Sequence, residues 1–423
     1  MLKRKFIARF LITILVTCLC KGAIATDLQE VLSLTLSTNN QLKVSRINLE
    51  GQLEVTKQIV SQKEPIVSAN ISNSNSWDLN ENNDQDTFSA DLAAAYTLYD
   101  GNKLNHTIKA ERYRIGILKE NLRELEQKVL LDAILAYLNV LRDLRLVELS
   151  EKNVSVLQQQ LDATSSRFSL GELTRTDVAY ATAALESAKS VLSARKGALY
   201  LSQSAFQAVV GIPPDGLTEQ IYIPTLPKTL DEAKEIAFTN NPKINAGVIE
   251  EKRFRALLEV AKAKSQPTIS LSSNISTGHT SSNGGRSALG LRLSGSLPIY
   301  SGGALKSGER EASAALEAAI TKSLLDRISI SQSVISSWSN LQVSAAVISA
   351  RKREVEASEL AYLGTIEEAR LGSRTILDVL NAEQALMNTR TELATAESDS
   401  LAAGFQLLMA IGKLDQKTLG IAQ

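Results

Sequence analysis

Four stretches of the chain alternate between apolar and polar or small residues, which is the period of a β-strand with one apolar face. The most regular are Phe88 to Leu98 and Leu289 to Ile299, where nearly every second residue is apolar. Shorter runs, Val67 to Ile71 and, more loosely, Ile269 to Ile275, precede them as partners. The pattern predicts four strands joined in pairs by polar loops, at about 65–78, 87–99, 267–277 and 286–300.

Long stretches outside these strands are rich in helix-forming residues, and the two longest contain no proline. The two longest, about 102–168 and 304–370, predict helices of roughly 100 Å each at a rise of about 1.5 Å per residue. Helices of this length need lateral partners. Shorter helical segments flank them at Leu28 to Glu64, Thr176 to Val210, Leu230 to Ser265 and Thr375 to Ile411. We expect the shorter helices of each half to lie end to end beside the long one, as in an antiparallel coiled coil.

The whole pattern occurs twice. Residues from about 28 to 212 return at about 230 to 412, shifted by roughly 201 positions, so that Leu170-Gly171 returns as Leu371-Gly372. This period excludes solenoids, whose repeats have about 20 to 50 residues. We therefore divide the chain into a first structural repeat at 26–212, a linker at 213–229 and a second structural repeat at 230–423, related by an internal twofold.

The first 25 residues are typical of a signal peptide. A basic start at residues 3–5 precedes an apolar run, Phe10 to Cys20, and Ala23-Ile24-Ala25 offers a cleavage site. The apolar run is shorter than the roughly 20 residues that a membrane-spanning helix needs. We expect residues 1–25 to be removed on export, with a lipid anchor on Cys18 or Cys20 as the minor alternative.

Composition excludes several functional classes for the mature chain. Removal of five basic and no acidic residues with the leader changes the formal net charge from 0 to −5, whereas nucleic-acid-binding proteins usually carry a clustered basic surface. Both cysteines lie in the leader, so no disulfide or thiol chemistry is expected. The two histidines, His106 and His279, fit no metal-ligand spacing, and no nucleophile or phosphate-loop motif is present. We expect no enzyme, no cofactor, no metal and no nucleic-acid partner.

Four strands cannot close into a barrel, although each has about the length that a tilted membrane strand requires. An open sheet edge is not tolerated in lipid, because its backbone amides are unpaired. Other copies of the chain must therefore complete the sheet, and three copies give about twelve strands, enough to enclose water. A soluble sandwich with a buried leucine face is the alternative for the strands taken alone.

Motifs at matching positions in both halves resemble the TolC family of outer-membrane efflux and secretion proteins. They are Pro298-Ile299-Tyr300-Ser301-Gly302-Gly303 with its weaker twin Thr97-Leu98-Tyr99-Asp100-Gly101, Arg167-Phe168-x-x-Gly171-x-x-Thr174-Arg175-Thr176-Asp177-Val178 with Gly372-x-Arg374-Thr375-x-x-Asp378-Val379, and Asn240-Asn241-Pro242. The resemblance covers essentially the whole mature chain, in both repeats and in the right order.

The resemblance implies a mainly α-helical homotrimer with membrane β-structure. A tunnel of twelve helices would cross the periplasm, with the linker in an equatorial belt, and continue into a twelve-stranded β-barrel in the outer membrane of a Gram-negative bacterium. The implied function is the passive exit duct of a tripartite efflux or type I secretion system. Its partners would be sister subunits, outer-membrane lipid, a periplasmic adaptor and an inner-membrane pump of the ABC or RND type. The alternative is a periplasmic adaptor, or a secreted helical structural protein or adhesin.

The resemblance also suggests residues that close the periplasmic mouth. Thr176 and Asp177 match a hydrogen-bond and ion-pair partner, and Arg374 matches the basic residue that reaches them. Asp378 matches one of two acidic rings. Asn381 stands where the second ring is expected, and Ala369 replaces an expected aromatic gate residue, so a less negative constriction is expected.

Two further groups of residues have expected places. Gly171 and Gly372 mark the tips where adaptor and pump would dock, and a strand–helix junction is expected at Tyr99, Gly101, Tyr300, Gly302 and Gly303. Tyrosine suits a water–lipid boundary, and glycine allows a sharp turn. Helix capping explains the same tip spacing without a gate, because glycine ends helices and threonine with aspartate begins them. Both interpretations stay open at this point.

Overall fold

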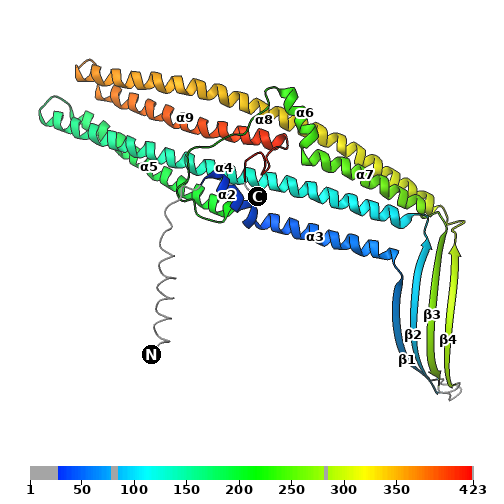
Figure 1. The fold of residues 1–423 in the computed structure, drawn as a ribbon. Helices are drawn as coiled ribbons and strands as arrows, with labels where there is room; N and C mark the ends of the chain where they lie inside the picture. Colours follow the sequence, from blue (N-terminus) through cyan, green and yellow to red (C-terminus); the bar gives the residue numbers. More distant parts are fainter. Residues whose placement is uncertain (1–26, 78–83, 281–283, 422–423) are drawn as a thin grey trace, which may run out of the picture. The chain divides into compact units, whose positions relative to one another are not determined.

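The computed structural model describes residues 27–77, 84–280 and 284–421, so the predicted signal peptide lies outside the described residues. The described chain is mainly helical, with one antiparallel sheet of four strands (Figure 1). Its main elements are α2 (Leu28–Thr38), α3 (Asn40–Val60), β1 (Ile66–Trp77), β2 (Asp84–Tyr99), α4 (Lys103–Ser169), α5 (Arg175–Val210), α6 (Leu230–Asn240), α7 (Pro242–Ala263), β3 (Thr268–Thr280), β4 (Gly284–Ser296), α8 (Ala304–Arg370) and α9 (Ile376–Ala410).

The chain forms two compact units. Unit 1 contains the described parts of residues 1–43, 124–241 and 330–423, and unit 2 contains those of 44–123 and 242–329. Each unit therefore combines segments from both halves of the sequence. The long helices α4 and α8, of 67 residues each, run from one unit into the other without a break.

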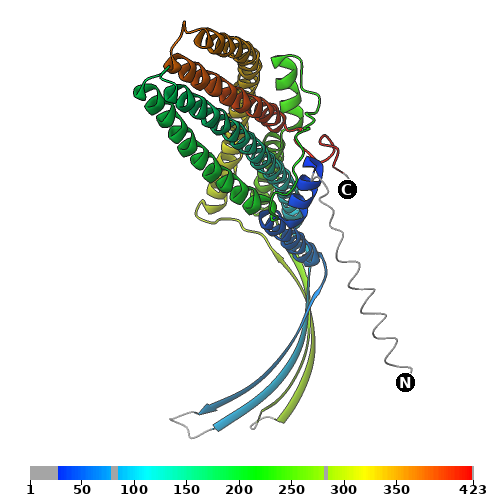
Figure 2. The ribbon, with the colours of Figure 1, turned by 90° about the vertical axis from the view of Figure 1, so that its left-hand side faces the viewer.

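Unit 2 contains the sheet, whose strands pair in the order β1-β2-β3-β4 (Figure 2). Successive side chains of a strand point to opposite faces, so the register decides which residues share a face. Ala69 lies opposite Leu92, Leu92 opposite Ile275, and Ile275 opposite Leu289, which gives one apolar face. The other face carries serine, asparagine and other polar or small residues. The predicted two-faced sheet is therefore present.

Some strand ends differ from those expected. β2 begins at Asp84 rather than about residue 87, because its pairing with β1 continues to Trp77 opposite Asp84. β3 extends to Thr280 rather than about 277 for the same reason, since it pairs with Gly284 of β4. β4 ends at Ser296 instead of about 300. Pro298 lies just beyond that end and has no N–H group to donate to a neighbouring strand.

Two predicted continuous helices, Leu28 to Glu64 and Leu230 to Ser265, are each broken into two. Asn39 ends α2 in an extended conformation, and its side-chain oxygen accepts hydrogen bonds from the N–H groups of Gln41 (2.9 Å) and Leu42 (3.2 Å). Asn241 is likewise extended at the end of α6. Pro242 follows it, disfavours helical geometry at the preceding residue and suits the first position of a new helix.

Each long helix has one shorter helix beside it in each unit. In unit 2, Gln52 of α3 donates to Glu111 of α4 (3.0 Å), and Lys243 of α7 pairs with Asp326 of α8 (3.3 Å). In unit 1, Lys196 of α5 pairs with Glu151 of α4, and Arg390 of α9 with Glu359 of α8. These contacts agree with the expected packing of two short helices beside each long one. None of the helices in the described part of the chain combines the length and apolar composition that a membrane crossing requires.

The largest fully buried side chains lie mostly in unit 1. They include Tyr137 of α4 and Phe206 of α5, whose ring centroids are 6.4 Å apart. The Tyr137 hydroxyl donates to the backbone oxygen of Thr218 at 2.8 Å, which fixes the segment after α5 to the middle of α4. Burial is the main cause that raises the pKa of Tyr137.

Candidate functional site

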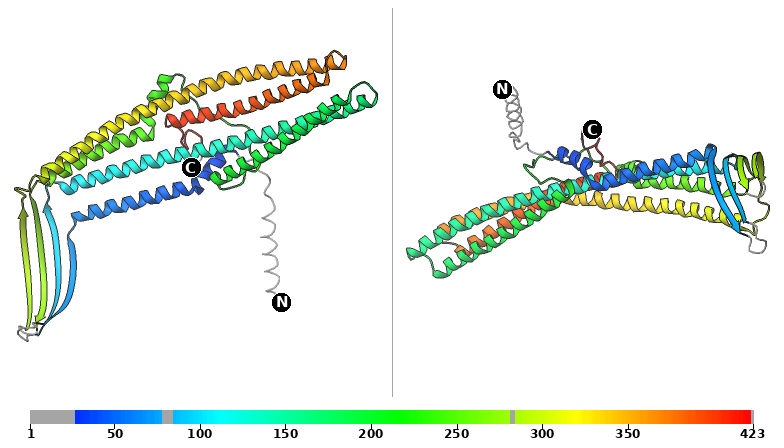
Figure 3. Two further views of the ribbon diagram at one scale, coloured as in Figure 1. Left: turned by 180° about the vertical axis from the view of Figure 1, so that it is seen from behind. Right: turned by 90° about the horizontal axis from the view of Figure 1, so that it is seen from below.

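Two helical hairpins of unit 1, α4–α5 and α8–α9, end in tips of the same construction (Figure 3). At the first tip, the N–H groups of Gly171 and Glu172 donate to the carbonyls of Phe168 (2.9 Å) and Arg167 (3.0 Å). At the second, Gly372 and Ser373 donate to Ala369 (3.1 Å) and Glu368 (2.9 Å). This arrangement is the Schellman motif that ends helices on a glycine with positive φ. Gly171 and Gly372 have φ of 80° and 82°.

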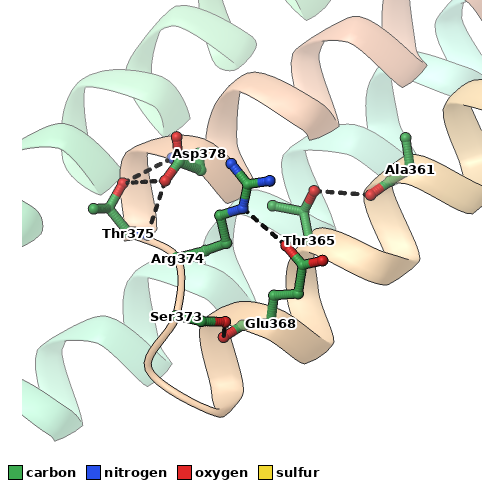
Figure 4. Close-up of polar contacts among 7 residues, drawn as sticks. All are labelled: Ala361, Thr365, Glu368, Ser373, Arg374, Thr375 and Asp378. Carbon is green, nitrogen blue, oxygen red and sulfur yellow. Dashed lines mark hydrogen bonds and ion pairs between the residues drawn. The ribbon is translucent and has the colours of Figure 1, made fainter.

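The next helix of each hairpin begins with a reciprocal cap. Thr375 accepts from the N–H of Asp378 at 3.2 Å, and the Asp378 carboxylate accepts from the N–H of Thr375 at 2.9 Å (Figure 4). Thr174 and Asp177 make the same pair of bonds at the first tip, at 3.3 Å and 2.9 Å. These bonds satisfy backbone N–H groups that the first turn of a helix leaves free. The capping interpretation is therefore correct for both aspartates.

The caps also keep both aspartates charged. The bonds from the backbone and the hydroxyl of Thr375 lower the pKa of Asp378 below its ordinary value. The hydroxyl and backbone of Thr174 lower the pKa of Asp177 in the same way. The capping bonds go to a single oxygen, Oδ2, of each carboxylate. The negative charge therefore stays available to other partners.

Arg374 lies between the Schellman turn and the cap of the second tip. Its Nε donates to Glu368 of α8 at 2.8 Å, and this contact is the first cause that raises the pKa of Arg374 (Figure 4). At the first tip, Arg167 donates from Nε to Glu172 at 3.1 Å. The structure therefore gives Arg374 an acidic partner on its own hairpin, whereas the sequence suggested Thr176 and Asp177.

Of the other residues named for the mouth and tips, Ala369 is buried near the end of α8, and the rest lie at the surface. Thr176 and Asn381 are exposed, one on α5 and the other on α9. Beside the two tip glycines, Leu170 and Leu371 expose 75% and 84% of their surface. Leucines exposed to this degree on both tips are a physical reason to expect a partner there.

The first turns of α9 are packed against the other hairpin. Ile376 and Leu380 of α9 form a buried apolar cluster with Leu157 of α4 and with Leu185 and Ala188 of α5. Asp378 therefore lies on a helix that is fixed by these apolar contacts, and Arg374 lies in the turn that precedes that helix. A change in position of one hairpin relative to the other must disturb this cluster.

Two residues near the second tip were missed by the sequence analysis. Glu368 has a recognisable signal, because it lies in the last turn of α8, from which it can face a basic residue after the turn. Glu383 has none. It is only 7% exposed, one of its carboxylate oxygens has no hydrogen-bond partner, and its burial follows from the packing of α9. Burial, followed by the hydrogen bond with Glu383, raises the pKa of Tyr362 on α8.

The predicted strand–helix junction residues lie where β2 and β4 lead into α4 and α8, in unit 2, and Tyr99 is the last residue of β2. Gly101 has a φ of 67°, and a side chain there would collide with Gln266, so glycine is required. Gly302 and Gly303 have φ of 60° and 85° in the turn before α8. Tyr99 and Tyr300 are both exposed. Exposed aromatic rings beside a two-faced sheet are consistent with the predicted water–lipid boundary.

Comparison with known proteins gives matches along most of the chain. The family described as outer membrane efflux protein matches residues 31–211 and 235–413. The chain is 30% identical over 329 residues to the outer membrane efflux protein BepC of Brucella suis biovar 1, which covers 77% of this chain and 72% of that protein. It is 25% identical over 415 residues to the outer membrane protein TolC of Escherichia coli, covering 93% and 84%.

A further relative is the alkaline protease secretion protein AprF of Pseudomonas aeruginosa, 25% identical over 368 residues that cover 81% of this chain and 73% of AprF. Among solved structures, a crystal structure of CusC superposes with a TM-score of 0.82 at 19% identity and covers 92% of both chains. At that identity the superposition shows the fold, and the sequence matches carry the family relationship.

Proposed function

The chain belongs to the outer membrane efflux protein family of Gram-negative outer-membrane channels, which are not enzymes, and on this basis we propose that it is the passive exit duct of a tripartite efflux or type I secretion system. In this proposal residues 1–25 direct export, and the two structural repeats with the linker at 213–229 form one subunit. The duct has no chemistry of its own, so energy and selectivity come from its partners.

The observation that carries the proposal is the two-faced sheet with open edges. β1 and β4 each pair on one side only within the described chain. On the apolar face, Leu289 and Leu291 expose 77% and 76% of their surface. An apolar face of this kind suits lipid, but unpaired edge amides do not. We infer that three copies join edge to edge in a barrel of about twelve strands around a polar lumen.

The helices support the same assembly. Large apolar residues on α8 are exposed in the single chain at helix-like intervals: Leu324, Ile328, Ile335, Val343 and Val347. Such a stripe on a long helix is normally covered by neighbouring helices. The stripe fits a homotrimeric tunnel in which the four helical columns of each copy pack against those of the next.

The experiment that tests this function combines assembly and conductance. The mature protein, purified from outer membranes in detergent, is expected to migrate as a heat-modifiable trimer and to form discrete ion channels in planar lipid bilayers. A detergent-free soluble monomer without channel activity would overturn the proposal.

We further propose that the tips form the closed periplasmic mouth. Asp378, Asn381 and Arg374 from α8–α9, with Thr176 and Asp177 from α4–α5, would line or close it. The exposed leucines beside Gly171 and Gly372 would dock the periplasmic adaptor and the inner-membrane pump, of the ABC or RND type. What supports this is the shared geometry of the two tips, with charge and apolar surface exposed together.

A pair of variants tests whether Arg374 acts at the mouth or only in its ion pair with Glu368. Replacing Arg374 with Ser is expected to raise single-channel conductance, because it removes a cation that holds acidic groups at the mouth. Arg167→Ser is the matched control, since Arg167 makes the equivalent contact with Glu172 at the other tip. Wild-type conductance in Arg374→Ser, or an equal rise in both variants, would contradict a specific role for Arg374.

A further inference from the structure

The polar face of the sheet carries an uneven set of charges. By the strand register, Asp91 of β2 shares that face with Asn70, Ser276 and Ala288. The same alternation places Arg286 and Arg292 of β4 on it, opposite Gly278 and Ser272. Among the described side chains of the strands, these are the charged residues of the polar face. Each sheet therefore contributes two positive charges and one negative charge to it.

The surroundings of the two arginines leave their charge exposed. Both side chains are exposed, and no ion pair involving either is found within the described residues. The residues opposite them are small and uncharged. Between them on the same face lie Ala288 and Gly290, and a side chain at Gly290 would collide with Asn274. The face is thus built from small residues over which two long cationic side chains extend.

The position of Asp91 limits how far it can neutralise them. It lies on β2, and β3 separates it from the arginines of β4. Adjacent strands are about 4.8 Å apart, so the backbones of β2 and β4 are separated by roughly 10 Å. That distance is about one Debye length at 0.1 M salt. The net charge of this face in each copy is therefore positive.

Resting on the proposed function, we propose that Arg286 and Arg292 make the strand-lined part of the duct anion-preferring, in contrast to the acidic tips. If the apolar face meets lipid, the polar face lines the water-filled path. Rings of arginine in a pore attract anions and repel cations. Anionic cargo, such as an acidic polypeptide, would then be favoured in the last part of the path.

The test measures ion selectivity of the full-length mature trimer in planar bilayers with a KCl gradient around 0.01 M, where the Debye length is about 30 Å and charge effects are weakly screened. The double variant Arg286→Ser/Arg292→Ser is expected to lower the permeability of chloride relative to potassium. Asp91→Asn is expected to raise it. Arg286→Lys/Arg292→Lys is the matched control, because it keeps the charge and should keep the selectivity. Every variant retains Asp378 and both tips, so differences between variants arise at the strands.

The outcomes are distinguishable. A protein that forms no channels refutes the proposed function itself. Normal channels whose selectivity does not change in the serine double variant refute this inference alone. A lysine variant that loses selectivity like the serine variant would also overturn it, because the effect would then come from packing rather than charge. Trimer migration in detergent gels checks that each variant is assembled.

Discussion

Asp378 combines a structural role with an electrostatic one on a single carboxylate. Its oxygen accepts from both the backbone and the hydroxyl of Thr375, and these bonds begin α9. The same bonds stabilise the ionised form and so lower its pKa. The capping role explains the local spacing of the motif, and the proposed gate uses the charge that capping preserves. The two roles can be separated by substitution, because an amide can cap without carrying a charge.

We predict that Asp378→Asn weakens block of the channel by divalent cations while leaving thermal unfolding almost unchanged. Asp378→Ala should weaken block equally and also lower the stability, because it removes the bonds from the N–H and the hydroxyl of Thr375 that cap α9. Asp177→Ala removes the equivalent capping bonds at the other tip and is the comparison for the unfolding measurement alone, because Asp177 is itself proposed to lie at the mouth. Single-channel recordings and unfolding curves measure the two effects. Unchanged cation block in both Asp378 variants would remove this residue from the gate.

The pH dependence of that block follows from the sign of the pKa shift. A lowered pKa in the folded protein means that the contribution of Asp378 to stability is complete above its ordinary value of 3.8 and is lost as the pH falls through the lower folded value. Cation block attributable to Asp378 should therefore be the same at neutral pH and at about pH 5, and disappear only below 3.8. The block that remains in Asp378→Asn is the baseline, and the difference from it is the block due to Asp378. Loss of this difference around pH 5 to 6 would contradict the assignment of the block to Asp378.

Among the elements, the long helices and the two-faced strands were predictable because their periods are sustained over many residues. The break at Asn39 was not, since it interrupts the helical pattern for a single residue, whereas Pro242 after Asn241 is a recognisable break signal inside the helix expected from Leu230 to Ser265. Asn39 caps the next helix through its side chain, and Asn241 precedes a proline. The strand end at Thr280 was set by pairing with β4, which the alternation alone does not reveal. The local sequence therefore predicts whether a segment is a helix or a strand more reliably than it predicts the residue at which that segment ends.

The ends of α5 and α9 offer a matched pair of glycines at equivalent positions of the two repeats. Gly211 has a φ of 94°, and the nearest atom to a Cβ placed there is the Thr38 hydroxyl at 3.8 Å. Gly412 has a φ of 73°, but a Cβ there would lie 2.6 Å from the Asn241 Cα. The break between α6 and α7 thus packs directly against the end of α9.

We predict that Gly412→Ala destabilises the protein clearly more than Gly211→Ala. Both substitutions incur the cost of a left-handed backbone conformation, about 1 to 2 kcal/mol. Gly412→Ala also forces backbone atoms apart and disturbs the bond from Gln127 to the Gly412 carbonyl (3.0 Å). Denaturant unfolding of the two variants under the same conditions measures the difference. Equal destabilisation would mean that the close approach at Gly412 contributes little.

At the scale of the whole molecule, residues whose environment depends on tertiary contacts escaped the sequence analysis. The tip motifs were recognisable because glycine, threonine and aspartate have fixed places in caps. The burial of Glu383 depends on how α8 lies against α9, whereas the pairing of Arg374 with Glu368 is local to one turn and was recognisable in principle. The proposed trimer rests on a different kind of argument, since it follows from the edge amides and apolar surface that one chain leaves uncovered.

The edges permit a direct test of the assembly. In a closed ring of copies, β1 of one subunit must pair with β4 of the next, whereas β2 and β3 pair inside one chain. The two cysteines of the chain, Cys18 and Cys20, lie in the predicted leader, so the sequence from residue 26 onward contains no other thiol to compete with introduced cysteines. Ser72→Cys combined in turn with Ala288→Cys, Gly290→Cys or Arg292→Cys scans possible registers of the edge pair, since the residues share the polar face.

We predict that at least one of these edge pairs forms covalent dimers and trimers on mild oxidation in outer membranes, seen on non-reducing gels. The control pair, Ser89→Cys with Gly278→Cys, faces across β2 and β3 of one chain and should give an internal cross-link that leaves the monomer size unchanged. Disulfides require Cα atoms within about 7 Å, so random collision between separate subunits is a weak competitor. Because an unpaired edge is so costly in lipid, cross-linking of the control pair without any edge cross-link would mean that β1 and β4 do not meet between copies.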